Sequence, residues 1–217
     1  DRIDAVNHPH PPPFAYYGGK TNLATRIASL LPAHTHYVEP FAGSLAVLLA
    51  KTPSRFETAN DLYGDLMTFW RVLRDRPGEL VRACSLTPHS RAELDTAREP
   101  THDDLERARR VWVLLTQARN PASPTWIRKI STTVGLSAPE YLGRYVDRMA
   151  AASERLARVS LECRLAVDVV ADYGAEPGVL IYADPPYLAS ARNSNHYRED
   201  MGSEAEHRDL AEALQAC

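Results

Sequence analysis

Short strand patterns alternate with helical stripes through the first third of the chain, and this alternation limits the fold more than any other feature. Residues 36–41 and 55–59 are typical of strands, and each run ends at a turn. A helix is expected after each strand, over 45–51 and from about 62 to 73, where apolar residues share one face. Strand–helix–strand–helix order is typical of a parallel, doubly wound α/β sheet.

The pattern changes from residue 76 to about residue 157. Helical stripes there surround a loop, 117–135, that is rich in Arg, Asn, Pro, Ser and Thr, and we interpret the stretch as an inserted helical subdomain. Strand patterns return at 159–163 and 179–183, and a last helix is expected from 203 to 216. Because doubly wound sheets usually have more than four strands, the sheet is expected to be truncated at the C-terminus.

Composition excludes several classes of protein. The longest unbroken apolar run, Leu45 to Ala50, is six residues long, whereas a membrane-spanning helix needs roughly 18 to 20. Residues 1–13 hold four prolines and no apolar core, so they are expected to form a disordered arm and not a secretory signal. The three cysteines form no CxxC pair and leave one thiol over in any disulfide scheme, which favours a reduced, cytoplasmic setting.

Charge is distributed unevenly along the chain. The net charge is −3, but residues 105–164 hold eleven basic and five acidic residues, a local charge of +6, and the remainder carries −9. A basic face that binds nucleic acid would produce this asymmetry, and so would an ordinary solvated helical surface.

The tetrapeptide Asp184-Pro185-Pro186-Tyr187 follows the last strand pattern, and open α/β sheets bind their ligands at the carboxyl ends of strands. Two consecutive prolines fix the backbone and remove two N–H donors, so the loop offers acceptors beside an aromatic ring. The Asp184 carboxylate and the Pro185 carbonyl could each accept one hydrogen of an amino group on a planar ring, on which Tyr187 would stack. A turn built on two prolines is the alternative without function.

Four motifs, in this order, resemble the Dam-type (D12 class) DNA adenine-N6 methyltransferases: Tyr16-Tyr17-Gly18-Gly19-Lys20, Glu39-Pro40-Phe41-Ala42-Gly43-Ser44, Asn60-Asp61 and Asp184-Pro185-Pro186-Tyr187. The resemblance covers about residues 14–215. It implies a Rossmann-like S-adenosylmethionine-binding catalytic domain, formed by 14–75 and 158–217, with a helical DNA target-recognition subdomain at 76–157. The implied activity is site-specific methyl transfer to adenine N6 in duplex DNA after base flipping.

The resemblance also implies roles for individual residues. The turn from Phe41 to Ser44 would wrap the methionine moiety, and Asp61 would bind the ribose hydroxyls unless it only caps the next helix. The family often has a glycine where this chain has Leu45, so a tighter turn is expected there. The implied catalytic residues are Asp184, Pro185, Pro186 and Tyr187, and the implied cofactor-binding residues are Tyr16, Lys20, Phe41, Gly43, Asp61 and Asp184.

For DNA, the resemblance places a sequence-recognising hairpin at 117–133 and a segment that closes over the flipped nucleotide at 193–197. Extrusion of a base costs a few kcal/mol, which phosphate contacts of the basic insert would offset. Asn can bind adenine and Arg guanine through two hydrogen bonds each, and which hairpin residue touches a base is left open. The implied DNA-binding residues are Arg119, Asn120, Arg128, Lys129, Asn193 and Tyr197.

The same residues are compatible with other functions. Methyltransferases acting on cytosine N4 or protein glutamine use related loops that typically begin with Ser or Asn, so Asp184 disfavours them. A nucleic-acid-binding module without catalysis remains a separate alternative, and cofactor binding would distinguish it. The histidines show no metal-ligand spacing, so no metal is expected. The protein is expected to be a monomer that acts on double-stranded DNA. Its role as a regulator, a phage product or part of a restriction system is left open.

Overall fold

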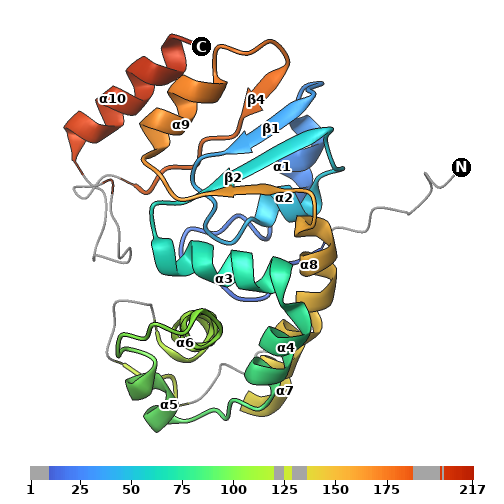
Figure 1. Cartoon of the computed structure of the whole chain (residues 1–217), viewed down its shortest axis with the longest axis vertical. Helices are drawn as coiled ribbons and strands as arrows, with labels where there is room; N and C mark the ends of the chain where they lie inside the picture. Colours follow the sequence, from blue (N-terminus) through green and yellow to red (C-terminus); the bar gives the residue numbers. More distant parts are fainter. Residues whose placement is uncertain (1–9, 120–124, 129–135, 188–200, 202) are drawn as a thin grey trace, which may run out of the picture.

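The fold is a parallel sheet with helices on both faces (Figure 1). The computed structural model describes residues 10–119, 125–128, 136–187, 201 and 203–217. The four strands of the sheet are β1 (His36–Glu39), β2 (Phe56–Asn60), β3 (Ser160–Glu162) and β4 (Val179–Ile181). These strands confirm the α/β class and the strand positions expected from the sequence.

The strand order is β3-β2-β1-β4, and every neighbouring pair is parallel. Strand β1 is central, with His36 opposite Phe56 of β2 and Val179 of β4. The chain builds β1, β2 and β3 in one direction and then crosses to the other side of β1, so the order reverses between β1 and β4. In doubly wound sheets, ligands bind at the carboxyl ends of the strands beside such a reversal.

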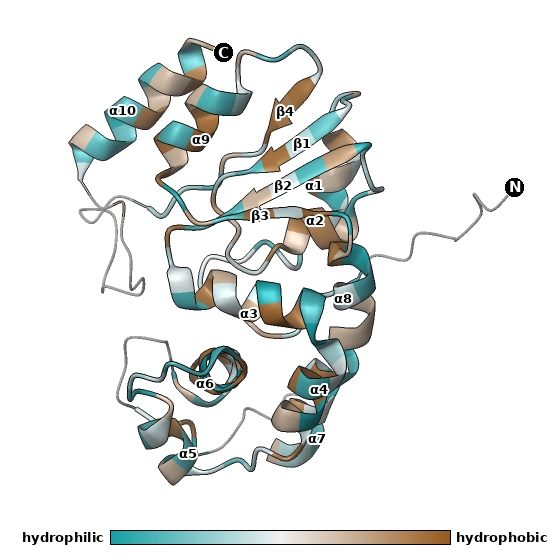
Figure 2. Ribbon diagram, viewed as in Figure 1, coloured by the Kyte–Doolittle hydropathy of each residue, from teal (hydrophilic) through white to brown (hydrophobic). Residues whose placement is uncertain are grey.

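Helices cover both faces of the sheet. In Figure 1, α9 (Ala166–Tyr173) and α10 (Glu204–Gln215) lie on one side, and α2 (Ala46–Ala50) and α3 (Gly64–Asp75) lie on the other. Helix α1 (Ala24–Leu30) packs against α2. Helix α2 is hydrophobic along its length (Figure 2), and four of its five residues are buried. A short helix of this kind is stabilised by burial, because its few hydrogen bonds cannot offset nucleation.

Among the described residues, five helices follow α3 before the chain returns to the sheet. They are α4 (Pro77–Ser85), α5 (Arg91–Thr96), α6 (Asp104–Gln117), α7 (Ala138–Asp147) and α8 (Met149–Leu156). Helix α6 packs along α3, and its run from Val111 to Leu115 is buried on all sides, as expected for a helix inside a core. One hydrophobic cluster continues from the sheet into these helices.

The packed chain begins earlier than the sequence suggested. Residues 10–13 were assigned to the disordered arm, but Pro12 and Pro13 are buried. The Trp112 indole donates a hydrogen bond to the Pro13 carbonyl at 3.2 Å, and Arg148 donates one to the Pro12 carbonyl at 3.1 Å. Residues 1–9 of the expected arm lie outside the described residues. Within the part of the chain that is described, no helix has the length and apolar character needed to cross a bilayer.

A buried ion cluster joins α8 to the sheet. The Glu57 carboxylate of β2 accepts hydrogen bonds from Lys51 at 2.6 Å and from both terminal nitrogens of Arg155, one of them at 2.7 Å. The three side chains are 3–5% exposed. Burial alone would raise the pKa of Glu57, but the hydrogen bonds and charge of Arg155, with those of Lys51, outweigh it and lower the pKa.

Arg155→Ala is expected to destabilise the fold strongly, because it removes both hydrogen bonds that Arg155 donates to the buried Glu57 carboxylate. We expect the free energy of unfolding in urea to fall by about 3–5 kcal/mol. Arg158→Ala, at an exposed arginine three residues along, serves as the control and is expected to change stability by less than about 0.5 kcal/mol. Equal stability of the two variants would contradict a structural role for the cluster.

Candidate functional site

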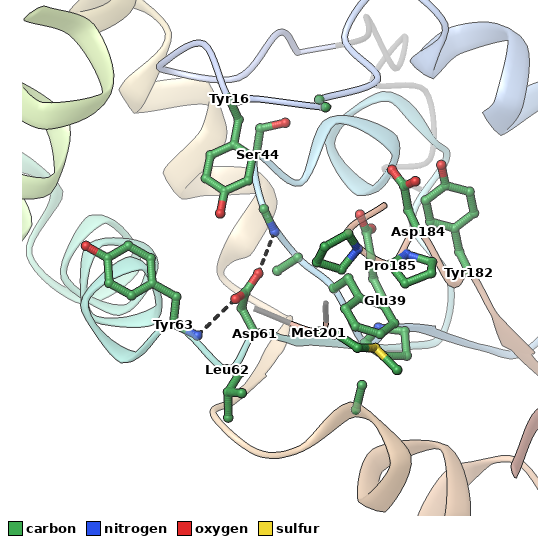
Figure 3. Close-up of a pocket in the computed structure, with 18 of the residues that line it drawn as sticks. Tyr16, Glu39, Ser44, Asp61, Leu62, Tyr63, Tyr182, Asp184, Pro185 and Met201 are labelled. Atoms are coloured by element: carbon green, nitrogen blue, oxygen red, sulfur yellow. Dashed lines mark hydrogen bonds between the residues drawn. The ribbon is translucent and has the colours of Figure 1, made fainter. Parts of the chain in front are cut away.

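A pocket of about 310 Å³ opens at the carboxyl ends of β1, β2 and β4. All four sequence motifs line it, through Tyr16 to Lys20, Glu39 to Ser44, Asp61 and Asp184 to Tyr187, and Figure 3 shows their arrangement. The start of α9 and one face of α10 complete the wall. Residues separated by more than 160 positions in the sequence therefore meet where the strand order reverses.

The turn after β1 approaches its neighbours too closely for larger residues. Gly43 has φ +44°, and a Cβ there would lie 3.1 Å from the ring of Tyr16. The Gly43 carbonyl accepts a hydrogen bond from the Trp70 indole at 3.1 Å, which anchors the turn to α3. This geometry gives a physical reason for glycine at the position that the resemblance assigned to the cofactor.

Leu45 occupies the position at which the family often has a glycine. Its φ of 53° lies in the left-handed region, which costs a residue with a Cβ roughly 1–2 kcal/mol. The side chain is fully buried, and burial of a leucine contributes about 1.5–3 kcal/mol. The turn therefore keeps the conformation that a glycine would favour, and packing stabilises it here.

Asp61 holds the turn from the neighbouring strand. Its carboxylate accepts hydrogen bonds from the backbone N–H of Gly43 at 2.9 Å and of Tyr63 at 3.0 Å (Figure 3). Burial raises the pKa of Asp61, and these two donors oppose the rise. The helix that follows starts at Gly64 with no side-chain cap, so the simple N-cap alternative for Asp61 is wrong.

Asn60 received no role from the sequence, yet it is fully buried beside the pocket. Its amide donates to the Pro40 carbonyl at 2.9 Å and to the Arg164 carbonyl at 3.0 Å, and its oxygen accepts from the Arg164 N–H at 2.8 Å. The side chain thus joins the loops after β1 and β3. An asparagine at the end of a buried strand was the available signal.

The Asp184-Pro185-Pro186-Tyr187 corner contains an ion pair. Lys20 donates to both Asp184 oxygens, at 2.6 and 2.7 Å, and also to the Gly18 carbonyl at 2.9 Å. Its ammonium lies 5.9 Å from the centre of the Tyr187 ring, which is 56% exposed. Lys20 was expected near the methionine end of the cofactor, and the structure places its ammonium on the Asp184 carboxylate.

Glu39 lies at the base of this corner, where Figure 3 shows it beside Asp184 and Pro185. Its carboxylate is 3% exposed and accepts a hydrogen bond from the Tyr37 hydroxyl at 2.9 Å. Burial raises the pKa of Glu39 to about 8, although the Tyr37 hydrogen bond opposes the rise. Sequence reasoning placed Glu39 in a motif without a role, and an acid inside a buried strand was the signal it missed.

The expected DNA-binding residues divide into two groups. Arg119 and Arg128 are exposed at the base of a hairpin, where Ala118 pairs antiparallel with Trp126. Asn120, Lys129, Asn193 and Tyr197 lie outside the described residues.

Two arginines of α6 form ion pairs with glutamates of the protein itself. Arg109 pairs with Glu93 at 2.6 Å and with Glu106 at 2.7 Å, and Arg110 pairs with Glu106 at 2.7 Å. Hydrogen bonds from Arg109, together with those from Arg110, lower the pKa of Glu106 to about 2. The positive charge of this segment is therefore only partly available to a polyanion. The described residues include no cluster of three His, Cys, Asp or Glu side chains that could hold a metal ion.

The raised pKa of Glu39 predicts a pH dependence of stability. Unfolding lets this carboxyl titrate near its ordinary value of 4.5, so the wild type loses stability as the pH rises from about 5 to about 8. Glu39→Gln keeps an acceptor for Tyr37 and lacks that loss. We expect it to gain on the order of a few kcal/mol relative to wild type across this window.

Thermal and urea unfolding at pH 5, 6.5 and 8 measure this difference. Glu154→Gln, at an exposed carboxylate of α8, is the control for the loss of one carboxylate charge. A Glu39→Gln difference that stays constant from pH 5 to 8 would show that Glu39 is ionised in the folded protein.

Comparison with known proteins supplies the family. The comparison with curated proteins gives no significant match. A family model described as D12 class N6 adenine-specific DNA methyltransferase matches residues 16–217, from the first pocket motif to the end of the sequence. Since the match covers nearly the whole chain and includes every segment that lines the pocket, the chain belongs to the D12 class of N6 adenine-specific DNA methyltransferases.

Proposed function

We propose that this chain transfers a methyl group from S-adenosylmethionine to the N6 amino group of adenine in duplex DNA, after the base has been flipped out of the helix. The observation that carries the proposal is the pocket itself. The acceptor corner at Asp184 and the glycine turn at Gly43 line one cavity and belong to strands on either side of the order reversal.

The pocket has the features that the cofactor needs. A Cβ at Gly19 would lie 2.9 Å from the Tyr16 carbonyl and one at Gly43 would lie 3.1 Å from the Tyr16 ring, so glycine at both positions lets the two turns pack closely on Tyr16 in the pocket wall. When bound, the cofactor supplies an electrophilic methyl group on a positively charged sulfonium. Tyr16 and Phe41 would pack against it, and Asp61 would accept hydrogen bonds from its ribose hydroxyls while still holding Gly43.

Asp184 and Pro185 would hold the target amine. Each offers an acceptor for one N–H of an exocyclic amino group, which draws the nitrogen lone pair out of conjugation with the ring. Lys20 would fix the Asp184 carboxylate in place, and Tyr187, which is exposed at the pocket mouth, would stack on the extruded base. Catalysis would then rest on positioning and electrostatics.

The helices of residues 76–157 would serve as the target-recognition part. The base of the 117–133 hairpin presents Arg119 and Arg128, both exposed and both without an ion pair to any described residue. Arginine recognises guanine and phosphate through paired hydrogen bonds.

Methyl transfer can be tested directly. Purified protein is incubated with S-adenosylmethionine carrying a tritiated methyl group and with duplexes of varied sequence, and the DNA is digested to nucleosides. Label is expected in N6-methyl-2′-deoxyadenosine. Label in N4-methyl-2′-deoxycytidine or in protein would refute the acceptor, and DNA binding without cofactor binding or methylation would favour the alternative of a catalytically incomplete nucleic-acid-binding module.

The role of Asp184 predicts a graded series. Asp184→Ala is expected to reduce kcat by on the order of a hundredfold or more, while cofactor binding weakens but survives. Asp184→Asn keeps a carbonyl acceptor and should retain more activity than the alanine variant. Single-turnover methylation measures the rate, and calorimetry measures cofactor binding. Unchanged turnover in Asp184→Ala would rule out the role given to this residue.

A further inference from the structure

A three-layer stack of side chains holds the base of the hairpin. The Trp126 indole lies on the His89 ring, with ring centres 4.6 Å apart and planes inclined by 26°. The Arg91 guanidinium lies 5.3 Å from the centre of the Trp126 ring. The stack therefore joins the start of α5 to the second half of the hairpin base, although Arg91 and Trp126 are 35 residues apart in the sequence.

Hydrogen bonds fix the stack in position. The His89 ring nitrogen Nε2 is 2.9 Å from the Ile127 carbonyl, directly after Trp126. The buried Gln117 amide accepts from the Ser90 N–H at 3.0 Å and donates to the Pro88 carbonyl at 2.9 Å. Residues 88–91 thus contact both sides of the hairpin base, through Gln117 and through Trp126 and Ile127. These contacts fix the position of Arg91 relative to the hairpin base.

Arg91 has features that the fold itself does not require. It is exposed and makes no ion pair with any described residue, in contrast to Arg109 and Arg110 nearby. It is the first residue of α5, where a positive charge gains nothing from the helix dipole. A guanidinium attracted to an aromatic ring can still donate its N–H groups to other partners, and their fork geometry matches a phosphate oxygen pair.

The location of Arg91 suits a DNA contact. Helix α5 packs against α6, and the hairpin base that carries Arg119 and Arg128 leaves from the end of α6. In Figure 1 the arrowheads of β1 and β2 point toward the left of the view, the side on which α5 also lies. Helix α5 carries two carboxylates, and neither forms an ion pair with Arg91: Glu93 is paired with Arg109, and Asp95 makes no ion pair with any described residue.

We propose that Arg91, held on the Trp126 ring, binds a DNA phosphate beside the bases contacted by the hairpin. The inference rests on the proposed function and adds a binding residue that lies outside the four motifs and the hairpin. The stack determines where the charge is held, and a phosphate contact contributes affinity without selecting a sequence.

Salt dependence of DNA binding tests the contact. Binding of the full chain to a methylatable duplex and to a scrambled duplex is measured by fluorescence anisotropy from 50 to 300 mM salt, with sinefungin as a non-reactive cofactor analogue. Arg91→Gln is expected to weaken binding to both duplexes by the same factor and to reduce the slope of log K against log salt by about 1. Arg55→Gln is the matched control. Arg55 is also exposed, and its guanidinium lies 5.2 Å from the centre of the Phe56 ring. Phe56 is the first residue of β2, at the end of the strand away from the pocket.

Variants of the platform separate orientation from charge. Trp126→Ala should lower the salt slope as Arg91→Gln does, and Trp126→Phe, which keeps a ring under the guanidinium, should restore most of it. Cofactor binding by each variant reports an intact fold. An unchanged slope in Arg91→Gln overturns the inference, and so does a loss confined to the methylatable duplex, which would make Arg91 a base contact. Wild-type protein that binds neither duplex would instead refute the proposed function.

Discussion

The site depends on the hydrogen bonds that Asn60 and Asp61 make at the end of β2. Asn60 joins the loops that follow β1 and β3, and Asp61 holds the backbone of Gly43 in the turn after β1. Both side chains are withdrawn from bulk solvent, where an unpaired amide or carboxylate is costly, so each holds its partners firmly. Two adjacent residues therefore set the shape of a pocket to which four distant parts of the chain contribute.

Much of this arrangement could be predicted from the sequence. The strand positions could be predicted because buried parallel strands appear in a sequence as short apolar runs, and the runs here end at turns. The position of the Asp184 corner followed from its place at the end of a strand. The parallel order then brings such ends to one edge, and the structure places the corner beside Gly43 and Asp61.

Other features depend on tertiary contacts and could not be predicted from the sequence. The left-handed conformation of Leu45 exists because the surrounding core stabilises it, and nothing in its neighbours along the chain indicates this. The eleven basic residues at 105–164 left open a basic face or an ordinary solvated surface, but the ion pair of Arg109 with Glu93 forms only because α5 packs against α6. Sequence counts register charges, whereas available charge depends on partners in space.

The continuous core has a consequence for how target specificity could change. Helix α6 packs along α3, the Trp112 indole reaches Pro13, and Arg155 of α8 is bonded inside the sheet, so the helices between α3 and β3 have no boundary at which they could be exchanged as a cassette. The hairpin base and its clamp at residues 88–91 form a much smaller unit, joined by the Gln117 hydrogen bonds and the Trp126 stack. If the hairpin reads the target as proposed, transfer of its specificity between relatives would require moving these two short segments together and leaving the rest of the scaffold intact.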